Sequence, residues 1–205
     1  MIKTNCFVVG YLQTNCYVVS SDVDNNAVII DAGGGFKKIN EYLIKENKLP
    51  VALLCTHGHF DHVLDAKKWE DAGVKIYLHP ADRELFYEEE ETFPGTKLNY
   101  DKAKEVIFVS DGEKLEFGEI SFTVKHTPGH TKGSVCYIGK NEIFSGDTVF
   151  FHSFGRTDLP GGDFGEIADS VNLILNTNED KIIYPGHGEC TTIKVERLFN
   201  PLYNR

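Results

Sequence analysis

The seven-residue segment Thr56-His57-Gly58-His59-Phe60-Asp61-His62 places three imidazoles and one carboxylate within six positions. Imidazole and carboxylate groups are good ligands for Zn²⁺, iron and Mn²⁺. His57 and His59 are spaced so that both can point the same way in an extended segment. Asp61 and His62 enter a predicted helix and would point elsewhere. This spacing favours two neighbouring metal ions over a single tetrahedral ion.

Three further ligand-type residues each follow a predicted strand and lie next to glycine: His130, Asp147 and His187. Small neighbours allow the backbone to approach a metal ion closely. Taken singly, each residue is more typical of a turn than of a metal site. Together with the first segment they make five histidines and two aspartates, enough for two sites of three protein ligands each plus one shared bridge.

The elements that must position these residues can be predicted from hydrophobic patterns. Apolar runs predict strands over 6–9, 15–19, 27–31, 51–55, 74–78, 105–109, 120–125, 134–138, 141–145 and 181–184. Many of these runs are continuous, which is typical of strands buried on both faces. Apolar stripes predict helices over 36–47, 62–71 and 164–175, with a short helical stretch over 192–198. Strands with interspersed helices indicate layered α/β packing, and residues 1–205 show no break that would mark a linker, so we expect a single domain.

The motifs H-x-H-x-D-H, G-H-T-x-G-S, G-D-T and G-H-G occur here in that order. This order resembles the metallo-β-lactamase superfamily and, within it, the short glyoxalase II-like (hydroxyacylglutathione hydrolase-like) proteins. The resemblance runs from Asn15-Cys16-Tyr17 and Asp31-Ala32-Gly33 through His187. It implies an α/β fold, the αβ/βα four-layer sandwich, with metal ions at one edge between two sheets.

The resemblance also implies a ligand set. The first ion would be held by His57, His59 and His130, and the second by Asp61, His62 and His187. Asp147 would bridge the two ions together with a water or hydroxide. Asp31 resembles a position that supports a metal ligand from behind, although an Asx turn explains it equally well.

Such a site is expected to hold two divalent metal ions, with zinc as the first choice and iron or manganese as alternatives. A water shared by two cations becomes a hydroxide nucleophile near neutral pH, and the cations stabilise the developing oxyanion. Hydrolysis of a thioester, lactone or activated ester needs little more, because a thiolate leaves without protonation. An amide would need an acid, for which Asp61 or a metal-bound water could serve. Asp61 and Asp147 are therefore the predicted catalytic residues.

Relatives within the superfamily can be weighed on single residues. Asp147 argues against true β-lactamases, and His59 argues against flavo-di-iron oxidases, where a Glu stands in that place. Only 18 residues follow His187, so we expect no counterpart here of the helical region that binds glutathione in glyoxalase II. The main alternative to a hydrolase is a mononuclear iron persulfide dioxygenase, in which residues matching His57, His130 and Asp147 bind the iron. An inert metal-binding protein is a third reading, disfavoured by the complete ligand set.

The segment Gly155-Arg156-Thr157-Asp158 resembles an element of both the short glyoxalase II-like proteins and the persulfide dioxygenases. The Arg156 guanidinium could bind a substrate carboxylate through two parallel hydrogen bonds, which makes Arg156 the candidate substrate-binding residue. The competing interpretation is a local pair with Asp158 that braces the loop.

Charge and composition restrict the partners. The formal net charge of −10 argues against a nucleic-acid partner, since phosphate backbones attract Lys- and Arg-rich surfaces. No run of eighteen apolar residues occurs, so no membrane span is expected. Five cysteines without a C-x-x-C pair indicate reduced, mostly buried thiols and a cytoplasmic location. The expected partner is a small-molecule acyl substrate, and the sequence leaves the oligomeric state open.

Overall fold

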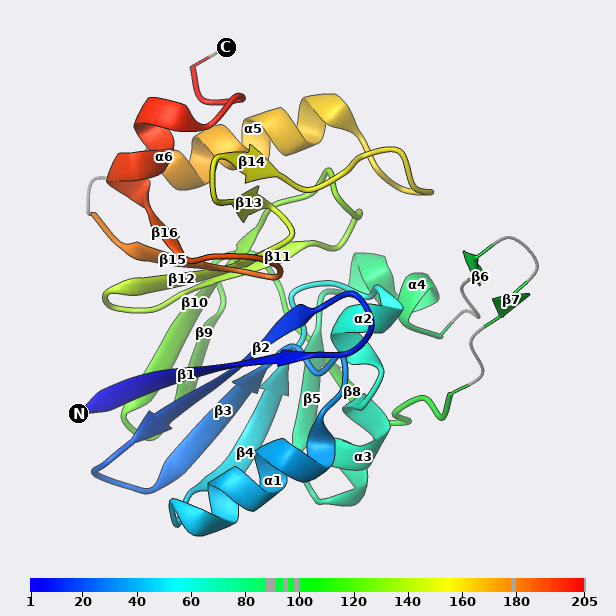
Figure 1. Cartoon of the computed structure of the whole chain (residues 1–205), viewed down its shortest axis with the longest axis vertical. Helices are drawn as coiled ribbons and strands as arrows, with labels where there is room; N and C mark the ends of the chain where they lie inside the picture. The colour runs from blue at the N-terminus through cyan, green and yellow to red at the C-terminus, as the bar shows by residue number, and fades with distance from the viewer. Residues whose placement is uncertain (88–90, 94–95, 98–99, 178–179, 205) are drawn as a thin grey trace.

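The computed structural model describes residues 1–87, 91–93, 96–97, 100–177 and 180–204. Two six-stranded sheets pack face to face, and helices cover the outer face of each sheet (Figure 1). This is the predicted αβ/βα four-layer sandwich.

The first sheet has the strand order β1-β2-β3-β4-β5-β8. The first three strands pair antiparallel, and β3, β4, β5 and β8 pair in parallel. Its strands are β1 (Ile2–Val9), β2 (Thr14–Ser21), β3 (Asn26–Ile30), β4 (Leu49–Leu54), β5 (Lys75–Leu78) and β8 (Val106–Phe108). The helices of this half are α1 (Phe36–Lys45), α2 (Phe60–Val63), α3 (Ala66–Asp71), the 3-10 turn η1 (Pro80–Asp82) and α4 (Arg83–Tyr87).

The second sheet has the order β16-β15-β12-β11-β10-β9, in which only β12 and β15 pair in parallel. Its strands are β9 (Lys114–Phe117), β10 (Ile120–His126), β11 (Val135–Ile138), β12 (Glu142–Gly146), β15 (Ile182–Pro185) and β16 (Thr191–Thr192). The helices α5 (Phe164–Leu175) and α6 (Ile193–Phe199) cover its outer face (Figure 1). Two small two-stranded sheets lie outside these larger sheets. They are formed by β6 (Glu91–Phe93) with β7 (Thr96–Lys97) and by β13 (Val149–Phe150) with β14 (Ser153–Phe154).

The predicted helix over 62–71 is two helices, because the chain turns between α2 and α3. The Asp65 backbone N–H donates to the Ala32 carbonyl over 2.8 Å, and the Asp65 carboxylate accepts from the Phe36 N–H over 2.9 Å. These contacts tie the turn to the glycine-rich segment before α1. The helix predicted over 36–47 ends at Lys45, because Asn47 adopts a left-handed backbone conformation with φ 52°.

Apolar side chains fill three layers, one between each pair of adjacent structural layers. The middle layer joins the two sheets and is rich in aromatic residues, with Tyr17 of β2 packed edge-to-face on Phe144 of β12 at a centroid distance of 5.3 Å. All eight residues of β2 are buried, as expected for a strand covered on both faces. The outer layers pack α1 and α3 on the first sheet and α5 and α6 on the second. The two sheets are thus held in a fixed relation, which matters for any site built from both.

All five cysteines are free thiols; Cys16, Cys55 and Cys136 are buried, while Cys6 and Cys190 are exposed. Among the described residues, no helix has the length and apolar character needed to cross a membrane.

Candidate metal centre

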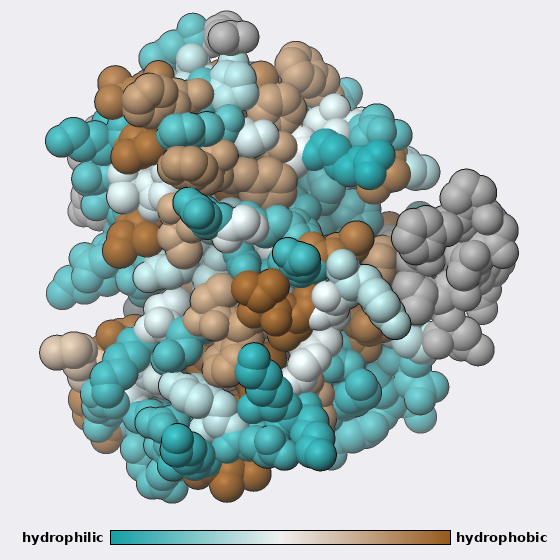
Figure 2. Space-filling model, in the orientation of Figure 1, coloured by the Kyte–Doolittle hydropathy of each residue, from teal (hydrophilic) through white to brown (hydrophobic). Residues whose placement is uncertain are grey.

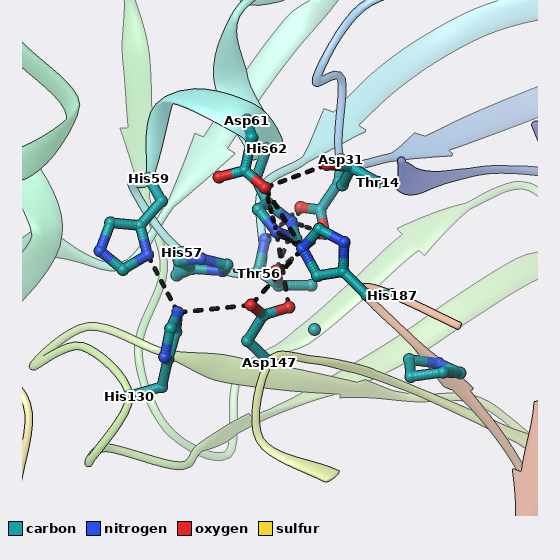
Figure 3. A network of polar contacts seen from close by, with 12 residues as sticks. Thr14, Asp31, Thr56, His57, His59, Asp61, His62, His130, Asp147 and His187 are labelled. Atoms are coloured by element: carbon teal, nitrogen blue, oxygen red, sulfur yellow. Dashed lines mark hydrogen bonds and ion pairs between the residues drawn. The ribbon is translucent and has the colours of Figure 1, made fainter. Parts of the chain in front are cut away.

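The predicted ligands all follow the carboxyl ends of strands. His57 follows β4, His130 follows β10, Asp147 follows β12 and His187 follows β15. Because β12 and β15 are parallel, and β10 and β12 both run antiparallel to β11, the second-sheet ligands meet at one edge. The face-to-face packing of the sheets brings this edge to the segment after β4, and all seven predicted side chains converge there (Figure 3).

The side chains assigned to the first ion form one group of metal-site dimensions. Ligand atoms of His57, His59 and His130 all lie within 4.8 Å of one another, and all three residues are buried. His59 Nδ1 and His130 Nε2 are 2.9 Å apart and face each other across the sheet interface. One half of the molecule therefore supplies two of these imidazoles and the other half supplies the third.

The side chains assigned to the second ion form another such group, made of Asp61, His62 and His187. His187 Nε2 lies 3.2 Å from Asp61 Oδ2 and 3.3 Å from His62 Nε2. Asp147 lies between the two groups, with one carboxylate oxygen 3.4 Å from His130 Nε2 and the other 3.4 Å from His62 Nε2. Asp147 also forms a third group of metal-site size, with His57 and His62.

A second observation also indicates that metal ions fit this cluster. His57 Nε2 and Asp147 Oδ1 are buried and have no hydrogen-bond partner within the described part of the chain. Buried polar atoms are nearly always paired, since an unpaired one costs about 1–3 kcal/mol. Both atoms face the centre of the cluster, where cations would satisfy them.

The outward ring nitrogens of four of the histidines have fixed oxygen neighbours, which orients each ring and leaves its other nitrogen facing the cluster. The pairs are His57 with Thr56 Oγ1 at 3.1 Å, His62 with Asp31 Oδ2 at 2.8 Å, His130 with the Arg156 carbonyl at 2.8 Å and His187 with the Leu12 carbonyl at 3.1 Å. Thr14 Oγ1 donates to Asp61 Oδ2 over 3.0 Å. Asp31 thus contacts the ring nitrogen of His62 that faces away from the cluster, which agrees with the interpretation that Asp31 supports a metal ligand.

The electrostatics of the cluster suit cations. Burial and the neighbouring histidines lower the pKa of His57, and likewise that of His59 to about 3, so both imidazoles are neutral donors. Burial alone would lower the pKa of His62. The adjacent carboxylates of Asp61, Asp31 and Asp147 outweigh this effect and raise the pKa of His62 to about 10. Burial also opposes ionisation of Asp61, yet the adjacent His62 and His187 and the Thr14 hydroxyl hold the pKa of Asp61 well below its usual range. The cluster therefore concentrates negative charge that bound cations would balance.

The His187 loop is anchored by residues for which the sequence predicted no role. Asn15 Nδ2 donates to the Pro185 carbonyl over 3.0 Å, and the Tyr17 hydroxyl donates to the same oxygen over 2.7 Å. Gly186 passes so close to the cluster that an added Cβ would overlap Asp147 Oδ1 and lie 2.7 Å from His62 Cε1. The signal in the sequence that could have indicated this anchoring role is the presence of two polar groups, the Asn15 amide and the Tyr17 hydroxyl, within a buried strand.

Arg156 contacts the cluster through its backbone carbonyl, which lies 2.8 Å from His130 Nδ1, while its guanidinium pairs with Asp158. Its side chain is 61% exposed and makes two hydrogen bonds of 2.7 Å to the Asp158 carboxylate. The local pair therefore forms in this structure. The predicted substrate-binding role of Arg156 remains a prediction, and it requires Asp158 to be displaced.

Apolar surface flanks the cluster on the side of β1. Figure 2 shows brown surface in the middle of the face that β1 and the following turn occupy in Figure 1. The exposed apolar residues of these segments include Val8, Tyr11 and Leu12, and Leu12 is the residue whose carbonyl contacts His187.

The chain matches the Metallo-beta-lactamase superfamily model over residues 9–187. It is 34% identical to the hydroxyacylglutathione hydrolase GloC of Haemophilus influenzae, over 94% of this chain and 93% of that protein. Its structure resembles that of the BLEG-1 B3 metallo-beta-lactamase, with a TM-score of 0.89, 35% identity and coverage of 99% and 100% of the two chains. It also resembles TTHA1623 in a di-iron-bound form, with a TM-score of 0.84, 33% identity and coverage of 96% and 98%. The chain therefore belongs to the metallo-beta-lactamase superfamily, which includes metal-dependent hydrolases.

Proposed function

We propose that this protein is a dinuclear metal-dependent hydrolase of a small acyl substrate, first of all a hydroxyacylglutathione-like thioester, with related esters and lactones next. The observation that carries the proposal is the convergence of three overlapping groups of metal-site size, one of which contains Asp147 with His57 and His62. The buried Asp147 Oδ1 has no hydrogen-bond partner among the described residues. The similarity to GloC over nearly the whole chain supports the thioester as the substrate class.

Within this proposal, His57, His59 and His130 would hold the first ion, Asp61, His62 and His187 would hold the second, and Asp147 would be shared by both ligand sets. Zinc is the first candidate metal, and the di-iron form of TTHA1623 supports iron as the second. Bound divalent cations lower the pKa of a water and polarise a carbonyl group. The chain itself orients the ligands: Thr14 fixes the Asp61 carboxylate, Asp31 fixes the His62 ring, and the Leu12 carbonyl fixes His187.

Asp61 and Asp147 are the proposed catalytic carboxylates. With the ions bound, their carboxylate oxygens would accept hydrogen bonds from water at the cluster and orient it towards a bound acyl group. The exposed apolar residues beside Leu12 would receive the acyl portion of the substrate. Arg156 would bind a substrate carboxylate once Asp158 releases it. The free cysteines agree with a reducing cytoplasm, which we propose as the location.

The test is metal content together with activity on three substrates. The protein is loaded separately with zinc, iron or manganese, and assayed for hydrolysis of a hydroxyacylglutathione thioester, for hydrolysis of a chromogenic cephalosporin and for oxygen uptake on glutathione persulfide. We expect two ions per chain and thioester hydrolysis. His59→Ala and His187→Ala should each lose activity by orders of magnitude, while the matched control His126→Gln, outside the cluster, should not.

Two other outcomes would replace the proposal. Cephalosporin hydrolysis without thioester hydrolysis would favour β-lactam hydrolysis, for which the likeness to BLEG-1 is the supporting observation. One iron per chain with oxygen uptake would favour the persulfide dioxygenase.

A further inference from the structure

Asp82 is a buried carboxylate that lies outside the seven-residue cluster and between its two halves. It ends the 3-10 turn η1 after β5, is 1% exposed and has no role in the ligand set. Its Oδ2 accepts from the Gly58 N–H over 2.9 Å and from the Thr131 hydroxyl over 2.7 Å, and its Oδ1 accepts from the Gly133 N–H over 2.6 Å.

These three donors belong to the two segments that carry the first group of imidazoles. Gly58 lies between His57 and His59, whereas Thr131 and Gly133 follow His130 in the turn between β10 and β11. Thr131 Oγ1 is also 2.7 Å from Ser134 Oγ, which fixes the turn itself. The packing is equally close, because a Cβ on Gly133 would lie 2.6 Å from the Asp82 carboxylate. One carboxylate thus holds both segments by their backbones.

We infer that Asp82 is a positioning residue for the first metal ion, setting the separation between the His57–His59 segment and His130 and thereby the affinity for that ion. The inference rests on the proposed dinuclear site. Asp82 contacts no residue of the second group through a hydrogen bond that the structure describes, so its loss should act on one ion and spare the other.

Asparagine at position 82 tests the contact with little change in shape. If the amide nitrogen replaces Oδ1, it faces the Gly133 N–H; if it replaces Oδ2, it faces the Gly58 N–H. Either orientation sets one N–H against another, and one segment must move away. Losing a hydrogen-bonded support of this kind typically weakens metal binding about 10–100-fold.

The experiment uses Co²⁺ as the probe, added to the metal-stripped full chain and followed by its visible absorption and by chelator competition. Wild type, Asp82→Asn, Asp82→Ala and Gly133→Ala are compared with two references, His59→Ala for a damaged first group and His187→Ala for a damaged second group. Asp65→Asn is the matched control, because Asp65 is also buried and accepts a backbone N–H, from Phe36, outside both ligand segments. Thermal unfolding of each stripped variant establishes that it is folded.

We expect the three variants at Asp82 and Gly133 to bind one Co²⁺ about 10–100-fold more weakly than wild type and to retain the other. The spectrum of their one-cobalt form should match that of His59→Ala, and Asp65→Asn should bind both ions as wild type does. The inference is overturned if both affinities are unchanged, if both fall equally, or if the remaining spectrum matches His187→Ala. If Asp82→Ala does not fold, Asp82→Asn and Gly133→Ala decide alone. Failure of the wild type to bind two ions would instead refute the proposed function, so the two failures are distinguishable.

Discussion

Replacing Asp31 by asparagine should remove the second metal ion while leaving the backbone in place. Asp31 is buried with φ 57°, a left-handed conformation that asparagine tolerates. Its Oδ1 accepts from the Thr56 N–H over 2.8 Å, and its Oδ2 lies 2.8 Å from His62 Nδ1. The oxygen of an asparagine can keep the Thr56 contact, and the amide nitrogen then faces the His62 ring.

The expected loss of metal affinity follows from the tautomer that His62 adopts beside the asparagine. Facing an N–H donor, His62 relieves the contact by becoming an acceptor at Nδ1, and the proton moves to Nε2. A protonated Nε2 has no lone pair for the cation, and this nitrogen is the one that lies 3.3 Å from His187 Nε2. Loss of such a support weakens metal binding about 10–100-fold, or about 1.4–2.7 kcal/mol.

The assay is competition between the protein and a chelator for Zn²⁺, with the metal content per chain measured at each step. Asp31→Asn should hold one zinc with near wild-type affinity and lose the second at a lower chelator concentration. Asp65→Asn is the control for a generally loosened fold. The reasoning is refuted if Asp31→Asn holds both ions as tightly as wild type, because His62 would then not depend on Asp31 for its tautomer.

Three further outcomes are expected. Gly186→Ala should lose metal and activity more than about 100-fold, since its methyl group would overlap Asp147 Oδ1 and crowd His62; retention of both ions by this variant would contradict the close approach. Stripping the metal should lower thermal stability, and each ion at about 100 times its dissociation constant should restore about 2.7 kcal/mol, or about 5–11 °C in Tm; an unchanged Tm in calorimetry would speak against binding to the folded state. Burial and the ring of His126, stacked at 4.2 Å, lower the pKa of His79 to about 4, so an NMR titration should find His79 neutral at pH 5 and His126→Gln should raise its pKa. The unfolded chain takes up the His79 proton at higher pH than the folded one, so His79 reduces stability as pH falls from about 6.5 to about 4; an ordinary pKa of His79 in both wild type and His126→Gln would refute the assignment.

The sequence predicted the buried strands well because their signal is local. β2 and β4 contain the apolar runs Cys16–Val19 and Val51–Leu54, and β12 contains Ile143 and Phe144; burial on both faces favours such runs. The strands β9 and β16 were not predicted, since they are two to four residues long and lie at sheet edges. The break between α2 and α3 depends on contacts of Asp65 with Ala32 and Phe36, which no helical periodicity encodes.

The ligand residues could be predicted because each combines a metal-binding type with a strand end and small neighbours. The residues that hold these ligands in position could not be predicted in the same way. Asp82 looks like an ordinary residue of a short turn, and its partners lie 24, 49 and 51 positions away. Only the packing of the sheets brings them together. Arg156 illustrates an ambiguity that remained, because the same guanidinium geometry suits a substrate carboxylate and the neighbouring Asp158.

The division of the cluster between the two sheets has a consequence during synthesis of the chain. Four of the seven ligand-type residues have been made once His62 is added, whereas His187 follows 125 residues later. A ribosome adds about 5–20 residues each second, so His187 is added roughly 6–25 seconds after His62. During that interval the nascent chain offers an incomplete set of imidazoles to any available metal. Tight retention must wait until the second sheet docks, which makes acquisition of the full complement of ions a late event in folding.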